Sequence, residues 1–223
     1  MLIPFPTLVK KYGIKPKGVL HLGANEGNEI DWYVDNGVQY VVFVEAIPSV
    51  FEKLKLNMAY WSNTKVIIHC MNACVSDVDG NEVDFNISSN KGESSSFLPF
   101  GVHKSLHPDV SFVDTIKLTT RRLDTLVNAK GQEDFGMLEE ELDFLNVDLQ
   151  GAELLALKGM GHMLTHFKWA YIEVNRMDTY VGCPMVEEVD YYMLQFGFHR
   201  IETSQWIGGA WADAFYSKAN MFV

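Results

Sequence analysis

The 223 residues, 48% of them hydrophobic and 21% charged, are enough to bury a substantial core and fit one α/β domain better than two. With 18 basic and 29 acidic residues, the formal net charge is −11. This charge argues against a dedicated nucleic-acid binder, because phosphate contacts need clustered Lys and Arg. A local basic pocket for a phosphorylated substrate stays possible. The three cysteines lack C-x-x-C spacing, so neither a disulfide framework nor a zinc site is expected. No apolar run suits membrane insertion, so the expected compartment is the cytoplasm.

Apolar runs alternate with helical patterns in the first third of the chain, as a parallel sheet requires. The second apolar run is almost continuous, which is typical of a strand buried on both faces. The expected elements are a strand at Gly18–Leu22, a helix at Asn28–Asn36, a strand at Tyr40–Val44, a helix from Pro48 through Met58 and a strand at Val66–Cys70.

The alternation breaks between Glu82 and Thr120. Both ends of this segment have strand-like alternation, whereas its middle is rich in Ser, Gly, His and Pro. An irregular insertion of this size is usually either functional or disordered, and its aromatic and histidine residues favour a functional segment. We therefore expect an inserted substrate loop or hairpin around residues 82–120.

The strand and helix pattern resumes after the insertion. The last two strand-like runs have no helix between them, which predicts an antiparallel pair. The sequence thus predicts a single α/β domain over residues 1–223, with a mostly parallel sheet. The later elements are a strand at Leu142–Val147, a helix at Ala152–Leu164, a strand at Trp169–Val174, a helix at Met185–Phe196, and strands at His199–Thr203 and Ala214–Ser217.

The stretch VLHLGANEGNE joins the first strand to the first helix through two glycines. Gly23 and Gly27 let the backbone pass close to a ligand, and the N–H groups at the helix start point toward it. The second strand ends at Glu45, where an acidic side chain can accept both hydroxyls of a ribose. A glycine turn with an acidic strand end indicates a nucleoside-containing cofactor.

The choice of cofactor depends on Asn25, which occupies the position of the second glycine in G-x-G-x-x-G. That glycine makes room for a pyrophosphate, so Asn25 argues against NAD and FAD. The G-x-x-x-x-G-K-[ST] motif of ATP-binding loops is absent from the sequence. S-adenosylmethionine (SAM), which has no phosphates, is the better fit by elimination, and an NAD-dependent oxidoreductase stays as the alternative.

Seven motifs occur one after another across residues 18–176. They are HLGANEG (21–27), FVEAIPSVFEKLKLN (43–57), NACVSDVDG (72–80), ESSSF (93–97), RLDTL (122–126), DFLNVDLQGAELLALKG (143–159) and YIEVN (171–175). With these motifs the chain resembles the FkbM-type SAM-dependent methyltransferases. The resemblance implies a Rossmann-like, seven-stranded methyltransferase fold with an antiparallel last strand and, most often, O-methylation of sugars or sugar-bearing small molecules.

The resemblance also implies roles for individual residues. The glycine turn would hold the methionine part of the cofactor, Glu45 the ribose, the residues after the third strand the adenine, and Asp148 would lie beside the transferred methyl group. The cofactor-binding residues implied in this way are His21, Gly23, Ala24, Asn25, Glu26, Gly27, Glu45, Ala46, Asn72, Ala73 and Asp148.

One position departs from the family pattern. The first motif of the family usually begins with an acidic residue that steadies the ammonium group of the cofactor, and this chain has His21 there. A neutral imidazole can still accept a hydrogen bond, whereas a protonated one would repel the ammonium.

Methyl transfer to a hydroxyl needs a group that takes the hydroxyl proton. Asp148 and Glu173 end adjacent predicted strands, so either carboxylate could be the base. Alternatively, the two carboxylates and Asn175 could together hold Mg²⁺. In a third alternative, Glu173 only caps polar groups of the insertion. His103, with an ordinary pKa near ~6.5, is the other candidate base, although a loop histidine is more often simply exposed.

The expected acceptor is a sugar-containing small molecule or a glycan, and a non-carbohydrate small molecule is the alternative. Tryptophan side chains near the end of the chain could stack on a sugar ring or could simply close the edge of the core. A non-catalytic binding module is disfavoured, since it would not need the carboxylates at the strand ends. The candidate substrate-binding residues are Ser94, Ser95, Ser96, His103, His107, Gln150, Asn175 and Trp211.

Overall fold

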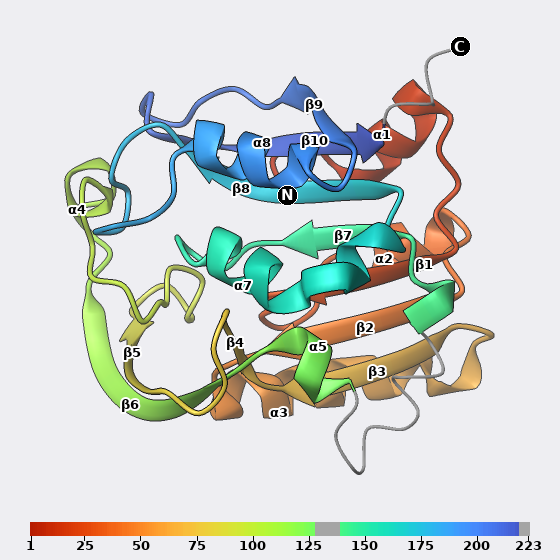
Figure 1. Cartoon of the computed structure of the whole chain (residues 1–223). Coiled ribbons are helices and arrows are strands. Elements are labelled where there is room, and N and C mark those ends of the chain that lie inside the picture. Colours follow the sequence, from red (N-terminus) through yellow and green to blue (C-terminus); the bar gives the residue numbers. More distant parts are fainter. Residues whose placement is uncertain (128–138, 219–223) are drawn as a thin grey trace.

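A seven-stranded sheet forms the centre of the structure (Figure 1), a computed structural model that describes residues 1–127 and 139–218. The strand order is β3-β2-β1-β7-β8-β10-β9. All seven strands of this sheet were predicted from the sequence, and the last strand in the chain is longer than predicted. Their bounds are β1 Gly18–Leu22, β2 Tyr40–Glu45, β3 Ile67–Asn72, β7 Phe144–Val147, β8 Trp169–Asn175, β9 Phe198–Thr203 and β10 Trp211–Lys218.

The pairing of the strands confirms the predicted mostly parallel sheet. β1 pairs in parallel with both β2 and β7, and β10 runs antiparallel to its neighbours β8 and β9. Because the chain continues from β1 outward to β2 and β3, and only later returns to add β7 on the other side of β1, the strand order reverses there. Open α/β sheets bind ligands at the carboxyl ends of the strands beside such a switch point.

Helices cover both faces of the sheet, and alternate residues of each central strand point to opposite sides. In β1, Val19 packs in the core beneath α1, α2 and α3, whereas Leu20 packs in the core beneath α5, α7 and α8. The helices α1 and α5 were not predicted, and the helix predicted at Ala152–Leu164 is divided into α7 and the 3₁₀ turn η3. The helices and turns are α1 Phe5–Tyr12, α2 Ile30–Asp35, α3 Pro48–Ala59, η1 Tyr60–Asn63, α5 Leu123–Leu126, η2 Glu139–Glu141, α7 Glu153–Met160, η3 Gly161–Thr165 and α8 Val186–Leu194.

The insertion expected at residues 82–120 forms a long antiparallel hairpin of β5 (Glu82–Ser88) and β6 (Phe112–Arg121). The short strand β4 (Cys74–Val75) pairs in parallel with the end of β6 and completes a second, three-stranded sheet. The Ser-, Gly- and His-rich middle of the insertion contains the short helix α4 (His103–Leu106). In Figure 1 this hairpin stands at the end of the main sheet where the parallel strands finish.

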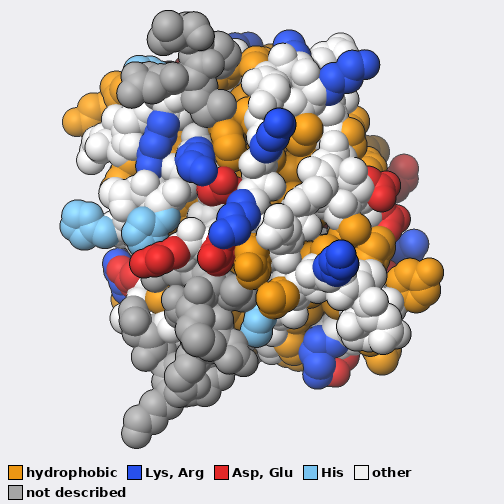
Figure 2. All heavy atoms as spheres, turned by 90° about the vertical axis from the view of Figure 1, so that its right-hand side faces the viewer, with side chains coloured by type: hydrophobic (Ala, Val, Ile, Leu, Met, Phe, Trp, Pro, Cys, Tyr) orange, Lys and Arg blue, Asp and Glu red, His pale blue; other side chains and the backbone are white. Residues whose placement is uncertain are grey.

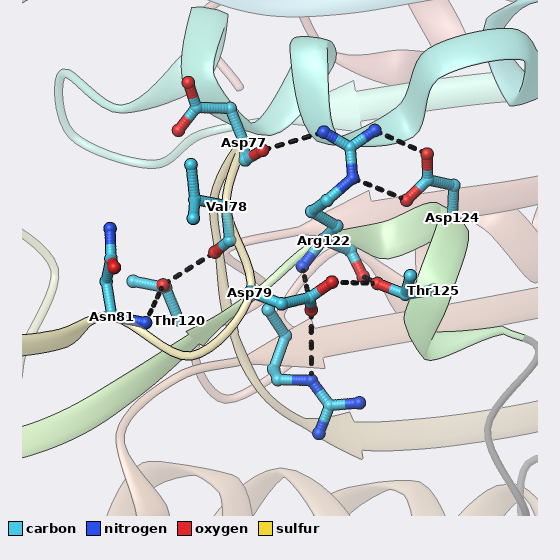
Figure 3. A network of polar contacts seen from close by, with 9 residues as sticks. Asp77, Val78, Asp79, Asn81, Thr120, Arg122, Asp124 and Thr125 are labelled. Carbon is cyan, nitrogen blue, oxygen red and sulfur yellow. Dashed lines mark hydrogen bonds and ion pairs between the residues drawn. The ribbon is translucent and has the colours of Figure 1, made fainter.

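A polar network fastens the base of the hairpin to the main domain (Figure 3). The Arg122 guanidinium donates to the carbonyl oxygen of Asp77 at 2.7 Å and to the Asp124 carboxylate at 2.9 Å. The Asp79 carboxylate accepts the backbone N–H of Arg122 at 2.9 Å and the Thr125 hydroxyl at 2.7 Å. The turn after β4 is therefore tied to the start of α5, which fixes where the hairpin leaves the domain.

Candidate active site

A cavity of about 550 Å³ opens at the carboxyl ends of β1, β2, β7 and β8, with the insertion forming one wall. This volume is in the range of small-molecule and cofactor sites. The structure thus brings most of the predicted site residues to one place. The predicted residues that line the cavity are His21, Gly23, Ala24, Asn25, Glu45, Ala46, Ala73, Ser94, Ser95, His103, His107, Asp148, Gln150, Glu173 and Trp211.

Five other predicted residues lie outside this lining, namely Glu26, Gly27, Asn72, Ser96 and Asn175. Glu26 forms an ion pair with Lys53 at 3.0 Å, and a Cβ on Gly27 would contact Leu54 and Met58 of α3 at 2.7 Å. The Asn72 side-chain amide donates to the carbonyl oxygens of Glu45 and Ala46, at 2.8 and 3.0 Å. Glu26, Gly27 and Asn72 thus support the cavity wall from outside, and their direct contact with a ligand stays a prediction.

The turn after β1 packs closely against the end of β7. Gly23 has a φ of +79°, and a Cβ at this position would lie 1.8 Å from the carbonyl oxygen of Asp148. The N–H groups of Gly23 and Ala24 both donate to the carbonyl oxygen of Val44. Only glycine satisfies both the left-handed backbone and this close approach.

Glu45, at the end of β2, has its carboxylate held in a fixed position beside the cavity. One carboxylate oxygen accepts the backbone N–H of Asn25 at 2.9 Å, and the other accepts the N–H of Ile47 at 2.8 Å. Burial raises the pKa of Glu45, and these backbone hydrogen bonds act in the opposite direction. The side chain is 6% exposed, and each of its oxygens retains a lone pair for a further donor.

His21 belongs to a buried polar group with Tyr33 of α2 and Asn146 of β7. Its Nδ1 lies 3.2 Å from the Tyr33 hydroxyl and its Nε2 lies 3.2 Å from Asn146 Nδ2. Burial lowers the pKa of His21 to about 4, so the imidazole is neutral near pH 7. Both ring nitrogens already have protein partners, and a ligand group would have to compete with these partners for the imidazole.

Gln150 connects the two carboxylates that were predicted to act in catalysis. Its side-chain amide donates to Asp148 Oδ1 at 2.5 Å and to Glu173 Oε2 at 3.0 Å. Its Oε1 accepts the hydroxyl of Tyr180 at 2.6 Å, and that hydroxyl also lies 3.2 Å from the carbonyl oxygen of Ser94. The backbone of Gln150 has a φ of +52°, a conformation that side-chain-bearing residues adopt at a cost. The side-chain amide of Gln150 therefore connects the ends of β7 and β8 to the insertion through the Tyr180 hydroxyl.

Burial and mutual repulsion raise the pKa values of three neighbouring acids. The pKa of Asp148 is raised to about 6 by burial and then by Asp213, and that of Glu153 is raised to about 7 mainly by burial. The pKa of Glu173 is raised well above its ordinary value by burial, then by Asp148 and Glu153. A buried carboxylate with a raised pKa is a stronger proton acceptor than an exposed one.

His103 is fixed in the wall formed by the insertion. Its ring stacks on Phe100 with centroids 4.3 Å apart and planes 6° apart, and its Nε2 lies 3.1 Å from Ser94 Oγ. Among the described residues, no group hydrogen-bonds to its buried Nδ1. The pKa of His103 is lowered to about 4 by burial, then by His107 and Lys104, so its ring is also neutral near pH 7.

Several residues of the cavity lining were not predicted from the sequence, and three polar ones among them are Tyr180, Asn146 and Asp213. Tyr180 lies in a loop without a recognisable motif, so only the structure could place it. Asn146 and Asp213 are polar residues inside the buried strands β7 and β10, and that unusual placement is a signal that the sequence did contain. Asp213 pairs with Glu173 in the register of β10 and β8, which brings both carboxyl groups to the same edge of the cavity.

The donor groups of the cavity do not favour a metal ion. Within the part of the chain that the structure describes, no group of three His, Cys, Asp or Glu side chains is arranged to hold one. The third residue of the predicted Mg²⁺ set, Asn175, is fully buried and does not line the cavity. The structure therefore gives no support to the Mg²⁺ expectation.

Lysine and arginine side chains are also absent from the described lining, so the basic pocket that the sequence left possible does not occur there. Lysines instead occupy the opposite end of the sheet, where Lys17 and Lys168 immediately precede β1 and β8. Figure 2 shows that end of the molecule, with blue side chains spread over its surface. The described lining of the cavity therefore carries acidic side chains without a lysine or an arginine.

Comparisons with known proteins agree with this arrangement. Residues 21–200 match the Methyltransferase FkbM domain family. The chain is similar to the 2-O-methyltransferase NoeI of Sinorhizobium fredii, with 25% identity over 171 residues that make up 74% of this chain and 65% of that protein. The chain therefore spans less than two thirds of the length of this curated relative.

Two solved structures share the fold. The methyltransferase FkbM from Methylobacillus flagellatus KT aligns with a TM-score of 0.60 and 14% identity, over 96% of this chain and 48% of that one. The magnesium protoporphyrin IX methyltransferase ChlM from Synechocystis PCC 6803, solved with bound SAM, aligns with a TM-score of 0.53 and 8% identity, over 96% of this chain and 76% of that one. Within residues 1–127 and 139–218, no helix has the length and apolarity needed to cross a membrane.

Proposed function

Because this chain belongs to the Methyltransferase FkbM domain family, we propose that it transfers a methyl group from SAM to a hydroxyl of a sugar-containing acceptor. The observation that carries the proposal is the Glu45 carboxylate, held by two backbone amides at the edge of a cavity beside the switch point of the sheet. This is the geometry in which an acidic strand end accepts ribose hydroxyls. The family match gives no support to the NAD-dependent alternative. The proposal takes residues 1–223 as a single methyltransferase domain.

The residues around the cavity fit the cofactor. The turn from Gly23 to Asn25 would lie against its methionine part, Glu45 would bind the ribose, and Ala73 would contact the adenine. When bound, SAM supplies a methyl group carried on a positively charged sulfur, and its transfer leaves neutral S-adenosylhomocysteine (SAH). Asp148 lies between the glycine turn and Glu173, where a carboxylate stabilises a positive charge.

The wall formed by the insertion would receive the acceptor. It offers the imidazole of His107, while the Ser95 hydroxyl already accepts the N–H of Ser88 at 2.9 Å. The indole of Trp211 on β10 also lines the cavity. Such a mixture of polar groups and an aromatic face suits a sugar ring. The described lining contains no lysine or arginine, which favours an uncharged sugar over a phosphorylated one. The name of the Sinorhizobium relative, a 2-O-methyltransferase, supports a hydroxyl as the methylated group.

Glu173 is the residue that we assign as the general base. Its raised pKa makes it a stronger proton acceptor than His103, whose pKa is lowered to about 4. In the transfer, Glu173 takes the hydroxyl proton of the acceptor as the hydroxyl oxygen becomes bonded to the methyl group. Gln150 orients the Glu173 carboxyl through its 3.0 Å hydrogen bond, and His103 would orient the acceptor.

Calorimetric titration with SAM, SAH and NAD tests the cofactor. We expect SAM and SAH to bind and NAD not to bind, and we expect Glu45→Ala to weaken SAM binding about ten-fold or more, because a hydrogen bond to a charged group contributes roughly 1.5–3 kcal/mol. The matched control is Glu52→Ala, an exposed acid on α3. The cofactor assignment is wrong if SAM does not bind, and the Glu45 assignment is wrong if the two variants bind SAM equally.

A methyl-transfer screen tests the acceptor. Purified protein with methyl-labelled SAM is incubated with methyl glycosides of common hexoses and with small aliphatic and aromatic alcohols. We expect label in the sugar products. Label only in the non-carbohydrate alcohols would overturn the sugar part of the proposal and leave the cofactor part standing.

A further inference from the structure

The turn that carries Gln150 has a backbone conformation that its sequence does not favour. Gln150 and Gly151 follow one another with φ values of +52° and +96°. The N–H of Ala152 donates to the carbonyl oxygen of Leu149 at 3.3 Å across them. Two left-handed central residues closed by such a bond are the pattern of a type I′ turn, which favours asparagine or glycine at its first central position. A glutamine there is strained, so the surrounding structure has to hold it in place.

Glu153, the first residue of α7, bonds to the backbone of this turn. Its Oε1 accepts the N–H of Leu149 at 2.9 Å and that of Gly151 at 3.0 Å. These are the N–H groups of the residues just before and just after Gln150, so one oxygen fixes the backbone on both sides of it. The Glu153 side chain is 0% exposed and does not line the cavity. It is therefore placed to act on the turn rather than on a ligand.

The carboxyl group of Glu153 is buried at a cost that is only partly compensated. Its Oε2 has no hydrogen-bond partner among the described residues. Burial raises the pKa of Glu153 to about 7, and its bonds to backbone N–H groups act in the opposite direction. An apolar residue of similar size would avoid this cost. What the carboxyl group contributes is therefore the pair of hydrogen bonds that Oε1 makes to the turn.

The turn is also packed against the loop after β8. A Cβ on Gly151 would lie 2.9 Å from Tyr180 Cβ, so the backbone of the turn touches that loop directly. The Tyr180 hydroxyl donates to Gln150 Oε1 at 2.6 Å. Gln150 is thus held by Tyr180 through its side chain and by Glu153 through its backbone. In this position its side-chain amide reaches Glu173 Oε2 at 3.0 Å.

We propose that Glu153 is a positioning residue of the methyl transfer: it holds the strained turn that aims the Gln150 amide at Glu173, and so keeps the general base oriented toward the acceptor hydroxyl. This inference rests on the proposed function, in which Glu173 takes the hydroxyl proton. It goes further because it gives a role to a buried acid outside the cavity.

The proposal predicts which step of the reaction depends on Glu153. Proton transfer to Glu173 depends steeply on the direction of its carboxyl group, which Gln150 sets. The proposed contacts of SAM with Glu45 and with the turn at Gly23 do not involve the Gln150 amide. Loss of Glu153 should therefore lower kcat and leave the affinity for SAM nearly unchanged.

A double-mutant cycle of Glu153→Met and Gln150→Ala tests the proposal. Methionine keeps the size and helix propensity of glutamate but lacks the oxygen that accepts the two N–H groups. With methyl-labelled SAM and the compound of the acceptor screen that shows the highest turnover, we expect each single variant to lower kcat about ten-fold. Because Glu153 acts through Gln150, the double variant should be within about two-fold of Gln150→Ala alone, whereas independent effects would multiply to about a hundred-fold.

Two further variants separate positioning from a general effect on stability. Glu153→Gln retains an oxygen for both N–H groups, and we expect its kcat to stay within about three-fold of that of the unmodified protein. The matched control is Glu188→Met, which removes an exposed carboxylate that accepts the N–H of Met185 at 2.9 Å at the start of α8. It should lower the free energy of unfolding without changing kcat. Calorimetry should give dissociation constants for SAM within about three-fold of one another in all these variants.

Nuclear magnetic resonance tests the positioning without an acceptor. In protein labelled with ¹³C and ¹⁵N at glutamine, the signals of Gln150 are identified by their absence from Gln150→Ala. We expect Glu153→Met to move the Cα and Cβ shifts of Gln150 away from left-handed values, and Glu153→Gln to leave them in place. Should Glu153→Met not fold, Glu153→Asp replaces it in both experiments, because its carboxylate lies one methylene group short of the turn.

The outcomes separate this inference from the proposed function. If SAM does not bind to the unmodified protein, the proposed function fails and the inference fails with it. If methyl transfer occurs but the double variant shows the full product of the two single effects, the inference is overturned and the methyltransferase proposal stands. The same conclusion follows if Glu153→Met keeps its kcat, if Glu153→Gln is as slow as Glu153→Met, or if the Gln150 signals do not move.

Discussion

Replacing Gly23 with alanine tests how closely the turn after β1 packs against the end of β7. Two separate penalties act at this position. The φ of +79° is unfavourable for alanine by about 1–2 kcal/mol, and the new Cβ would lie 1.8 Å from the carbonyl oxygen of Asp148. That oxygen belongs to backbone beside the β1–β7 pairing, where Asp148 N donates to the carbonyl oxygen of Leu22 at 3.0 Å, so it cannot move without loss of sheet contacts.

Gly37 provides the matched control, because it has a φ of +85° and a Cβ there would meet nothing within 4 Å. We expect Gly37→Ala to lower the free energy of unfolding by about 1 kcal/mol, the strain alone, and Gly23→Ala to lower it by about 4 kcal/mol, strain plus clash. Urea unfolding followed by circular dichroism measures both. Equal losses in the two variants would refute the argument that the glycine is required by the approach of Asp148.

Three further predictions follow from other contacts. The pKa of His21 is about 4 in the folded chain and near ~6.5 when unfolded, so its contribution to stability is present above about pH 6.5 and is lost as the pH falls toward 4. His21→Asn should therefore remove about 2 kcal/mol of the difference in unfolding free energy between pH 7 and pH 4.5. Identical pH profiles for the two proteins would contradict this. Tyr180→Phe removes the hydroxyl that orients Gln150 and should lower kcat about ten-fold while changing the dissociation constant of SAM less than three-fold, which steady-state kinetics and calorimetry separate. Asp79→Ala should increase hydrogen exchange at the amide of Arg122 and lower stability by about 1 kcal/mol, and an unchanged exchange rate would show that the network does not fasten the hairpin.

Much of the fold could be predicted because the buried strands have distinct sequence patterns. β1 is a mostly apolar run followed directly by Gly23, β2 is an almost continuous apolar run, and the hairpin ends of the insertion alternate with a period of two. β4 could not be predicted, because a strand of two residues has no periodicity and exists only through its pairing with β6. The helix α1 was not predicted, although a proline in its first turn is well placed to begin a helix.

The cofactor half of the candidate site was more predictable than the acceptor half. Residues at strand ends, such as Glu45 and Asp148, have positions fixed by topology, so the strand pattern alone brings them together. Tyr180 and its bond to Gln150 depend on how a loop after β8 folds back onto the insertion, and no local pattern encodes that contact. The neutral state of His21 could not be predicted either, because it results from burial against Tyr33 and Asn146.

The hairpin of β5 and β6 has a consequence for how proteins of this kind can diverge. Its pairing partner is β4, and the network around Asp79 and Arg122 joins its base to the main domain, so it adds no strand to the seven-stranded sheet. Changes in its length or sequence therefore leave the register of β1, β2 and β7 intact. On the proposed function, a new acceptor could be accommodated by exchanging this one segment, while the machinery that holds the methyl donor is inherited unchanged.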